Sequence, residues 1–152
     1  MPSNPMLKLL LADWSRTEMT AKPIRQAVFI EEQNVPEQEE WDNYDENALH
    51  VVASLDGNPI GTARLTSDAV IGRMAVLSEF RGQGVGTAML KQLIQIAKKS
   101  RLKTVQLNAQ KTAVEFYAKH GFIAEGEEFM DAGIPHIKMQ LDTTWWSEAI
   151  YN

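Results

Sequence analysis

The sequence predicts an α+β domain in which a mostly antiparallel central sheet is flanked by helices. A strongly amphipathic helix is expected at residues 85–99, because Met89, Leu90 and Leu93 lie on one apolar stripe. Most of the predicted strands precede that helix, and the others follow it. The stretches with strand-like apolar patterns are residues 49–55, 60–66, 69–76, 104–108, 122–129 and 134–141.

The N-terminal third supplies one further strand and one further helix. Residues 7–12 form a short apolar run, and residues 20–32 carry apolar side chains at helical spacing. Residues 35–46 are acidic and contain a proline, so we expect a loop or a broken helix there.

The order of the later elements indicates how the sheet is connected. An Asp-Gly pair at residues 56–57 favours a tight hairpin. The strand at 69–76, the helix at 85–99 and the strand at 104–108 have the order of a right-handed crossover between parallel strands. A short helix is expected at 112–119.

Composition limits the classes of function. The 152 residues fit one domain spanning 1–152, and the net charge of −5 gives no general attraction to nucleic acid or anionic membranes. The chain has no cysteine, which excludes disulfides and thiol catalysis, and its three histidines lack metal-ligand spacing. Residues 1–5 carry no signal pattern, and no apolar run reaches the roughly 20 residues of a membrane helix. We therefore expect a cytoplasmic protein.

The most informative motif is a glycine-rich loop at residues 81–86, Arg-Gly-Gln-Gly-Val-Gly, between a predicted strand and a predicted helix. Helix N-termini expose unpaired N–H groups with partial positive charge, and glycines let an anion approach them closely. Arg81 would add a charge-assisted contact. The loop predicts a phosphate or pyrophosphate site, although a plain turn between strand and helix could have the same glycines.

Two nucleotide-binding motifs can be compared with this loop. The P-loop needs a lysine directly after its last glycine, but Thr87 follows Gly86 here. The dinucleotide fingerprint needs a third glycine where Thr87 stands. Neither motif fits.

The loop does resemble the coenzyme A loop of the GNAT superfamily of N-acetyltransferases, Arg/Gln-x-x-Gly-x-Gly/Ala, at Arg81, Gly84 and Gly86. Residues 73–94 resemble the strand–loop–helix core of that superfamily throughout. The sequence AVEFYAKHGF at residues 113–122 resembles its second signature. Two matching motifs in the right order are more specific than one.

The resemblance covers about residues 48–141, and residues 25–46 resemble the opening of a small bacterial-type branch of the superfamily. It implies the acyl-CoA N-acyltransferase fold, in which one strand splays from its neighbour and the pantetheine arm of coenzyme A inserts beside it. The Met74 N–H would then polarise the acetyl carbonyl and stabilise the oxyanion. The coenzyme-binding residues that the resemblance implies are Met74, Ala75, Val76, Arg81, Gly82, Gln83, Gly84, Val85, Gly86, Thr87, Asn108 and Tyr117.

The resemblance also implies individual roles. Backbone N–H groups of residues 82–87 would hold the pyrophosphate. Asn108, at the end of its predicted strand, would contact the pantetheine arm, or it would only cap the strand. Tyr117 would lie beside the thioester sulfur and protonate the leaving thiolate as a general acid, or it would be a core aromatic residue.

The general base is less clear from the sequence. His136 and Glu32 are the first candidates, because a histidine suits proton transfer near neutral pH and Glu32 ends a helix where the superfamily binds substrates. Each has a structural alternative, since a histidine in a strand is often structural and a charge run is usually a solvated face. The full set of candidates is Glu31, Glu32, His50, Asp131 and His136.

The sequence thus predicts an N-acetyltransferase that transfers the acetyl group of acetyl-coenzyme A to a primary amine by direct attack in a ternary complex. We expect a small-molecule amine rather than a protein as acceptor, no metal, and no nucleic-acid or membrane partner. The acidic residues between 31 and 46 favour a cationic acceptor. A non-catalytic acyl-CoA sensor and a plain phosphate- or nucleotide-binding domain are the alternatives. The Trp145-Trp146 tail could support a homodimer or fold back on its own core.

Overall fold

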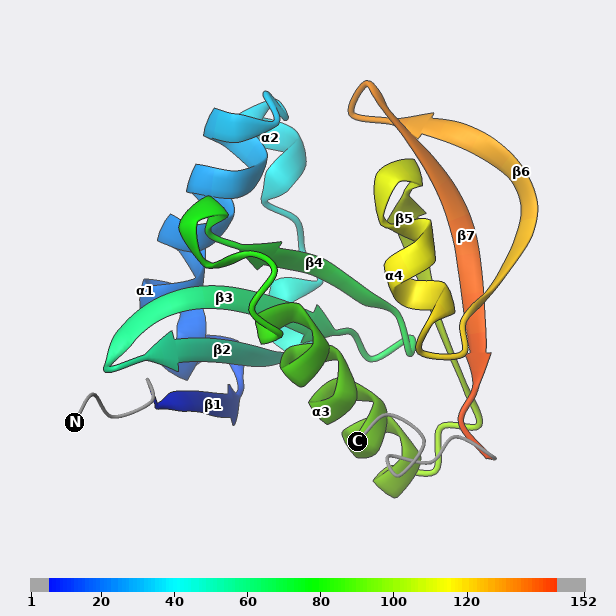
Figure 1. Ribbon diagram of the computed structural model, residues 1–152, viewed down its shortest axis with the longest axis horizontal. Helices are drawn as coiled ribbons and strands as arrows, with labels where there is room; N and C mark the ends of the chain where they lie inside the picture. Colours follow the sequence, from blue (N-terminus) through cyan, green and yellow to red (C-terminus); the bar gives the residue numbers. More distant parts are fainter. Residues whose placement is uncertain (1–5, 145–152) are drawn as a thin grey trace.

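The computed structural model describes residues 6–144, and Figure 1 shows two groups of strands with helices around them. The strands are β1 (Leu7–Ala12), β2 (Leu49–Leu55), β3 (Asn58–Leu65), β4 (Ile71–Val76), β5 (Thr104–Gln110), β6 (Ile123–Asp131) and β7 (Ile134–Asp142). The α-helices are α1 (Trp14–Arg25), α2 (Glu37–Glu40), α3 (Val85–Lys99) and α4 (Val114–Ala118). The π-helix η1 (Gln26–Glu32) continues α1, and 3-10 turns form η2 (Asp45–Asn47), η3 (Ser78–Phe80) and η4 (Lys111–Ala113). The predicted α+β class is confirmed.

The described part of the chain, 6–144, contains no helix long and apolar enough to cross a membrane. The tail with Trp145 and Trp146 lies outside the described residues, so its predicted role stays a prediction.

The strands form two antiparallel sheets with the orders β1-β2-β3-β4 and β5-β7-β6. The sheets are joined where the chain before β4 meets β5, at an isolated parallel bridge between Val70 and Gln106. There the Gln106 N–H donates to the Ala69 carbonyl at 3.1 Å. Beyond this point β4 and β5 diverge, as Figure 1 shows. The single central sheet that the sequence predicts is therefore divided into two halves, and the expected splay is present.

Helix α3 forms the centre of the core. Its apolar stripe is fully buried at Met89, Leu90, Leu93, Ile94 and Ala97. β3 is buried from Ile60 through Leu65, so helices cover both of its faces, with α3 on one side and α1 on the other. A side chain at Gly61 would place its Cβ 3.1 Å from Cε of Met89, so glycine is what lets α3 lie this close to the sheet.

The first helix is longer than its apolar pattern predicts. It begins at Trp14, because the Asp13 side chain accepts a hydrogen bond from the Arg16 N–H at 3.2 Å and caps the N-terminus. The first turns are largely polar, so periodicity alone placed the start at residue 20. The end changes to a π-helix, in which the Gln33 N–H donates to the Val28 carbonyl at 3.1 Å. π-Helical turns are rare and frequently occur at functional sites.

The acidic segment after η1 is held by a buried ion-pair network. Arg25, which is 1% exposed, donates from Nε to Glu40 at 2.7 Å and from Nη1 to Asp45 at 2.8 Å. Its guanidinium lies 5.0 Å from the ring centre of Trp41 and 5.6 Å from that of Trp14. Burying these charges is tolerable only because each one is paired and hydrogen-bonded.

Two arginines of the sheet complete the network. Arg64 on β3 donates from Nη1 to Asp42 at 2.7 Å and to Asp45 at 2.8 Å. Arg73 on β4 donates to the Glu40 carbonyl at 3.0 Å and to Asp42 at 3.1 Å. Burial opposes the charge of Asp42, but the hydrogen bond from Arg64 and the charges of both arginines hold its pKa below the ordinary value. Residues 37–47 are thus fastened to the sheet and are not a loose acidic rim.

Replacing Arg25 should make the protein less stable toward unfolding by urea. Arg25→Met leaves Glu40 and Asp45 buried with fewer partners, and we expect the free energy of unfolding in urea to fall by about 3 kcal/mol. The matched control is Lys138→Met, which removes an exposed pair with Glu125 at 3.3 Å and should change stability by less than about 1 kcal/mol. Equal losses in the two variants would contradict a stabilising role for the network.

Candidate active site

A bulge in β4 turns two neighbouring side chains toward the same space. In the β3–β4 register, Arg73 and Met74 together lie opposite the single residue Ala63. A bulge breaks the alternation of side chains along a strand. Arg73 adopts a φ of 49°, a left-handed conformation that costs a non-glycine residue about 1–3 kcal/mol and that tends to occur at functional sites. Arg73 and Met74 both line one cavity as a result.

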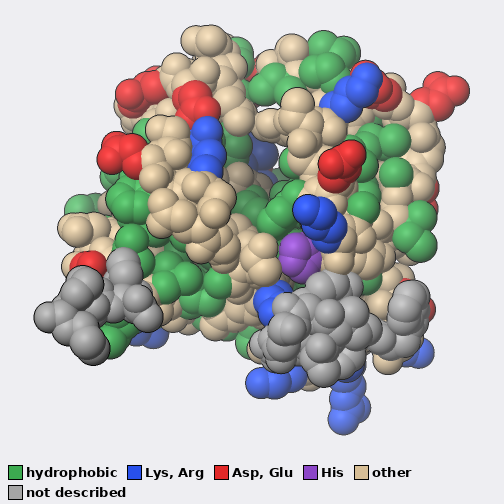
Figure 2. All heavy atoms as spheres, in the orientation of Figure 1, with side chains coloured by type: hydrophobic (Ala, Val, Ile, Leu, Met, Phe, Trp, Pro, Cys, Tyr) green, Lys and Arg blue, Asp and Glu red, His purple; other side chains and the backbone are tan. Residues whose placement is uncertain are grey.

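Two cavities meet beside this bulge. The larger, about 310 Å³, is bounded by the segment from η1 to α2, by β4 and β5, and by the β6–β7 hairpin. Figure 2 shows the surface hollowed between the two halves at this place. The smaller, about 300 Å³, lies against the glycine loop and α4. Met74, Ala113 and Tyr117 line both cavities, so ligands in the two would meet at these residues.

The smaller cavity opens onto the N-terminus of α3. Gly82 and Gly84 have left-handed φ values of 76° and 84°, and Gly84 is the N-cap residue. No side chain caps this helix, so the N–H groups of its first turn face the loop without intrahelical acceptors. A Cβ at Gly86 would lie 3.4 Å from Cζ of Phe116, which leaves little room for a larger residue. The loop therefore has the geometry of an anion-binding site, as its sequence predicts.

The loop's arginine makes an unpredicted ion pair. Arg81 donates from Nη1 and Nη2 to the two carboxylate oxygens of Glu32, each at 2.7 Å, and from Nε to the Val76 carbonyl at 2.9 Å. The hydrogen bond from Arg81 lowers the pKa of Glu32. The pair joins the end of η1 to the end of β4 and is exposed to solvent on both sides. Glu32 does not line either cavity.

Tyr117 lies on α4 at the boundary of the two cavities. Its hydroxyl is 3.8 Å from Sδ of Met74, and its ring meets Phe116 and Phe122 edge-on, at centroid distances of 5.0 and 5.9 Å. Burial raises the pKa of Tyr117 to about 12, so the phenol keeps its proton at any ordinary pH.

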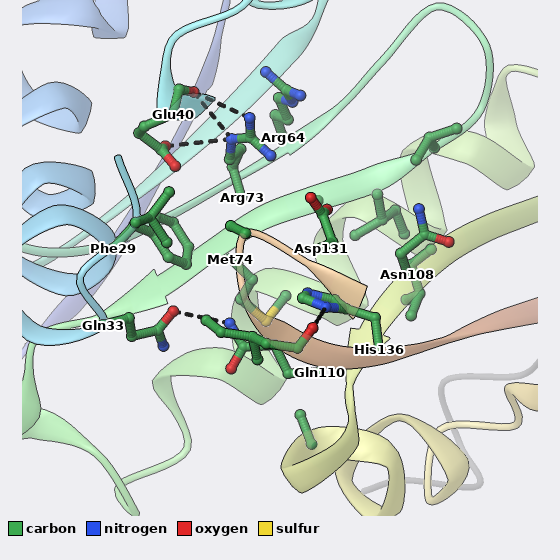
Figure 3. A pocket seen from close by; sticks show the side chains of 18 of the residues that line it. Phe29, Gln33, Glu40, Arg64, Arg73, Met74, Asn108, Gln110, Asp131 and His136 are labelled. Carbon is green, nitrogen blue, oxygen red and sulfur yellow. Dashed lines mark hydrogen bonds and ion pairs between the residues drawn. The ribbon is translucent and has the colours of Figure 1, made fainter. Parts of the chain in front are cut away.

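His136 lies on β7 and lines the larger cavity (Figure 3). Its Nδ1 is 2.7 Å from the Ile134 carbonyl oxygen, and its ring stacks on Phe129 at 5.9 Å. A carbonyl can only accept, so Nδ1 carries a hydrogen, and Nε2 of the neutral ring keeps its lone pair. The geometry thus presents His136 as an oriented proton acceptor.

Some of the other predicted site residues line the larger cavity, and others lie away from it. Asp131 and Asn108 line the larger cavity, while Glu31 is exposed and lines neither. His50 is buried in the ion-pair network, with Nε2 2.9 Å from the Asp45 carbonyl, and burial lowers its pKa. Strand β5 runs two residues further than predicted, so the residue at its end is Gln110 and not Asn108.

Sequence reasoning missed four polar residues of the larger cavity, Gln33, Arg64, Arg73 and Gln110. Gln110 donates to Gln33 at 2.9 Å and so joins the end of β5 to the segment after η1. No local sequence pattern predicts that Arg73 lines the cavity, because its orientation depends on the bulge in β4. The buried alternation of Val105, Leu107 and Ala109 does extend to the real strand end and would have pointed to Gln110.

A diverging pair of parallel strands, an uncapped helix N-terminus and a phenol between two cavities define the class of protein, an acyl-coenzyme A-dependent N-acyltransferase. The chain belongs to the GNAT acetyltransferases: residues 11–143 match the family model described as Acetyltransferase (GNAT) domain. GNAT acetyltransferases use acetyl-coenzyme A as co-substrate. Within residues 6–144 no three histidine, aspartate or glutamate side chains are grouped to hold a metal ion.

Similar proteins support the same family. The chain is 39% identical over 123 residues to Uncharacterized N-acetyltransferase YjcF of Bacillus subtilis (strain 168), an alignment that covers 78% of this chain and 88% of YjcF. The structure superposes on an acyl-CoA N-acyltransferase from Pseudomonas aeruginosa with a TM-score of 0.80 and 30% identity, over 90% of this chain and 99% of that one. It superposes on ElaA of Escherichia coli with a TM-score of 0.80 and 28% identity, over 89% and 99%.

A matched pair of glycines tests the anion loop. Gly84 and Gly57 have φ values of 84° and 86°, and an added Cβ meets no atom within 4 Å at either position. Both alanine variants should lose about 1–2 kcal/mol of stability through backbone strain. Only Gly84→Ala should weaken coenzyme A binding in calorimetry, by about tenfold, if the N–H groups at this helix N-terminus bind the pyrophosphate as the loop sequence predicts. Equal affinity of the two variants would contradict this assignment.

Proposed function

We propose that the chain transfers the acetyl group of acetyl-coenzyme A to the primary amine of a small molecule, by direct attack in a ternary complex. The observation that carries the proposal is that Met74 and Tyr117 line both cavities. Donor and acceptor can then be bound at the same time and meet at one place. The name of the relative YjcF, an N-acetyltransferase, supports acetyl as the transferred group.

The smaller cavity takes the donor in this proposal. The N–H groups of residues 82–87 hold the pyrophosphate, and the backbone of Met74, Ala75 and Val76 binds the pantetheine arm where β4 has left β5. The Met74 N–H donates to the carbonyl oxygen that becomes negative during attack, as in an oxyanion hole. Asn108 and Gln110 of β5 line the larger cavity and not the smaller one.

Tyr117 assists the departure of the sulfur. The acceptor nitrogen forms its bond to the acetyl carbon, the C–S bond breaks, and the sulfur leaves as a thiolate toward the phenol. An ordinary thiol has a pKa of about 8.5, below that of the buried phenol. Most of the effect of Tyr117 is therefore its hydrogen bond to the developing thiolate, with transfer of the proton completing the thiol.

His136 is the better placed of the two predicted bases. Its Nε2 keeps a lone pair, and the ring lines the cavity in which the amine binds. Glu32 is engaged with Arg81, and its lowered pKa makes it a weaker base. We assign proton removal from the acceptor to His136 and a positioning role on Arg81 to Glu32.

Removing the phenol tests the proposed function. Tyr117→Phe should lower kcat/KM for acetyl transfer by about 100-fold while coenzyme A affinity stays close to that of the native chain, because the hydroxyl acts only on the leaving sulfur. Release of free thiol in the presence of an amine panel is the measurement. Tight coenzyme A binding with no transfer to any amine would instead favour an acyl-CoA sensor.

The pH profile gives an independent check on Tyr117. Because the pKa of Tyr117 is raised from 10 to about 12, the phenol stays protonated below that value and is lost only above it. The native chain and Tyr117→Phe should therefore have parallel kcat profiles between about pH 7 and pH 10. An alkaline decline in this window that is present in the native chain and missing in the variant would contradict the assignment.

Two substitutions separate the candidate bases. His136→Gln should reduce kcat by about 100-fold, because a neutral amide cannot accept the proton. Glu32→Gln should leave kcat near the native value and change only the KM for acetyl-coenzyme A, through its partner Arg81. The reverse order of effects on kcat would assign the base to Glu32.

A further inference from the structure

We propose that the acceptor carries a carboxylate as well as its amine, and that Arg73 binds this carboxylate in the larger cavity. The inference rests on the proposed function, because it names the substrate class of the same site. It starts from Arg73, a wall residue with a left-handed φ whose side chain the β4 bulge directs into the space where the acceptor lies.

The guanidinium of Arg73 is held on one side only. Nε lies 3.3 Å from a Glu40 carboxylate oxygen, and Nη2 donates to the carbonyls of Glu39 and Glu40 and to Asp42 (Figure 3). Nη1 makes no hydrogen bond or ion pair within residues 6–144. The side chain is 26% exposed, as is that of Asp42, whereas that of Glu40 is 3% exposed. A fixed guanidinium with one unused N–H edge suits a carboxylate, which it binds with directed hydrogen bonds.

A second guanidinium in the cavity wall is also incompletely satisfied. Arg64 lines the larger cavity, and its Nε is buried without a hydrogen-bond partner in the described structure. A buried unpaired donor is uncommon in a folded protein and calls for a partner. That Arg64 atom is not exposed to the cavity, so Arg64 contributes positive charge to this end of the wall, and Arg73 supplies the donor that a ligand can reach.

Three carboxylates of the acidic segment are already paired with arginines, while Glu39 and Asp131 also line the cavity. The sequence favoured a cationic acceptor because of its acidic segment, but Glu40, Asp42 and Asp45 are each paired with an arginine. Asp131 lines the cavity from the β6–β7 side, beside His136, and no ion pair engages it within residues 6–144. An acceptor whose carboxylate binds Arg73 and whose amine lies near Asp131 and His136 is complementary to both ends of the cavity.

The volume restricts the acceptor to small molecules. A cavity of about 310 Å³ lies at the lower end of the range for small-ligand sites. An amino-carboxylate of amino-acid size is therefore the class of acceptor that fits the charge and the space together.

Matched acceptors test the inference on the native chain. Glycine, alanine, leucine, phenylalanine and glutamate are each compared with the corresponding carboxamide and decarboxylated amine, with acetyl-coenzyme A as donor. We expect kcat/KM for the best free acid to exceed that of its carboxamide by about 10- to 100-fold. An α-carboxamide has a less basic amine and more free nucleophile at neutral pH, so a preference for the acid reports recognition of the carboxylate.

The variant Arg73→Gln should remove the preference. We expect the acid-to-amide ratio of kcat/KM to fall by about 10- to 100-fold and approach one, because only the acid uses the guanidinium. Loosening of the wall segment that Arg73 also holds should affect both acceptors alike. This ratio is insensitive to a general loss of folded protein. Arg101→Gln is the matched control, because Arg101 also has a left-handed φ, 62°, but lies outside both cavities. Arg101→Gln should keep the native ratio.

The outcomes separate the inference from the proposed function. Acetylation of amines with no preference for the free acids, or a preference that survives Arg73→Gln, would overturn the carboxylate site and leave the acetyltransferase standing. Failure to acetylate any amine would overturn the proposed function. Calorimetric titration of the same acids and carboxamides into the protein with coenzyme A bound then decides the carboxylate site by itself, since Arg73 should still bind only the acids.

Discussion

The site depends on one constraint, the parallel bridge between Val70, just before β4, and Gln106 of β5, after which the two strands diverge. A parallel pair that separates after one bridge leaves backbone N–H and C=O groups of both strands without strand partners. An extended ligand can satisfy those groups as an added strand would. The same divergence opens the two cavities and places Met74 and Tyr117 where they meet. Continuous pairing of the strands would close the donor cleft and cover the acceptor cavity.

The second constraint is the ion-pair network that fastens residues 37–47 to the sheet. Its three arginines come from α1, β3 and β4, and its carboxylates come from one short acidic segment. The network turns a segment with little regular structure into a fixed wall of the acceptor cavity. It also pairs Glu40, Asp42 and Asp45 with arginines, so these three carboxylates are not free to bind a cationic substrate.

Apolar periodicity and glycine positions were enough to predict helices and strands whose bounds depend on neighbouring residues. The bounds of α3 and β2 agree with the structure, because an apolar stripe after a glycine N-cap and a run of buried β-formers are each read within a few residues. The start of α1 was wrong by one and a half turns, since Asp13 caps a stretch without an apolar stripe. The bulge at Arg73 and the pairing of Arg81 with Glu32 join residues up to 49 positions apart in the chain, and no single-sequence pattern reports them.

This difference explains why the donor could be inferred before the acceptor. The proposed pyrophosphate site is a continuous loop at a helix N-terminus, so residue types and spacing are enough to propose it. The acceptor cavity is assembled from η1 to α2, β4, β5 and the β6–β7 hairpin, and its charge depends on which of its ionic groups are already paired. Counting acidic residues in the sequence does not report the charge of this cavity, because Glu40, Asp42 and Asp45 are each paired with an arginine. The place of Arg73 in the cavity wall depends on the bulge in β4 and on its contacts with residues 39–42, and no local sequence pattern reports either of them.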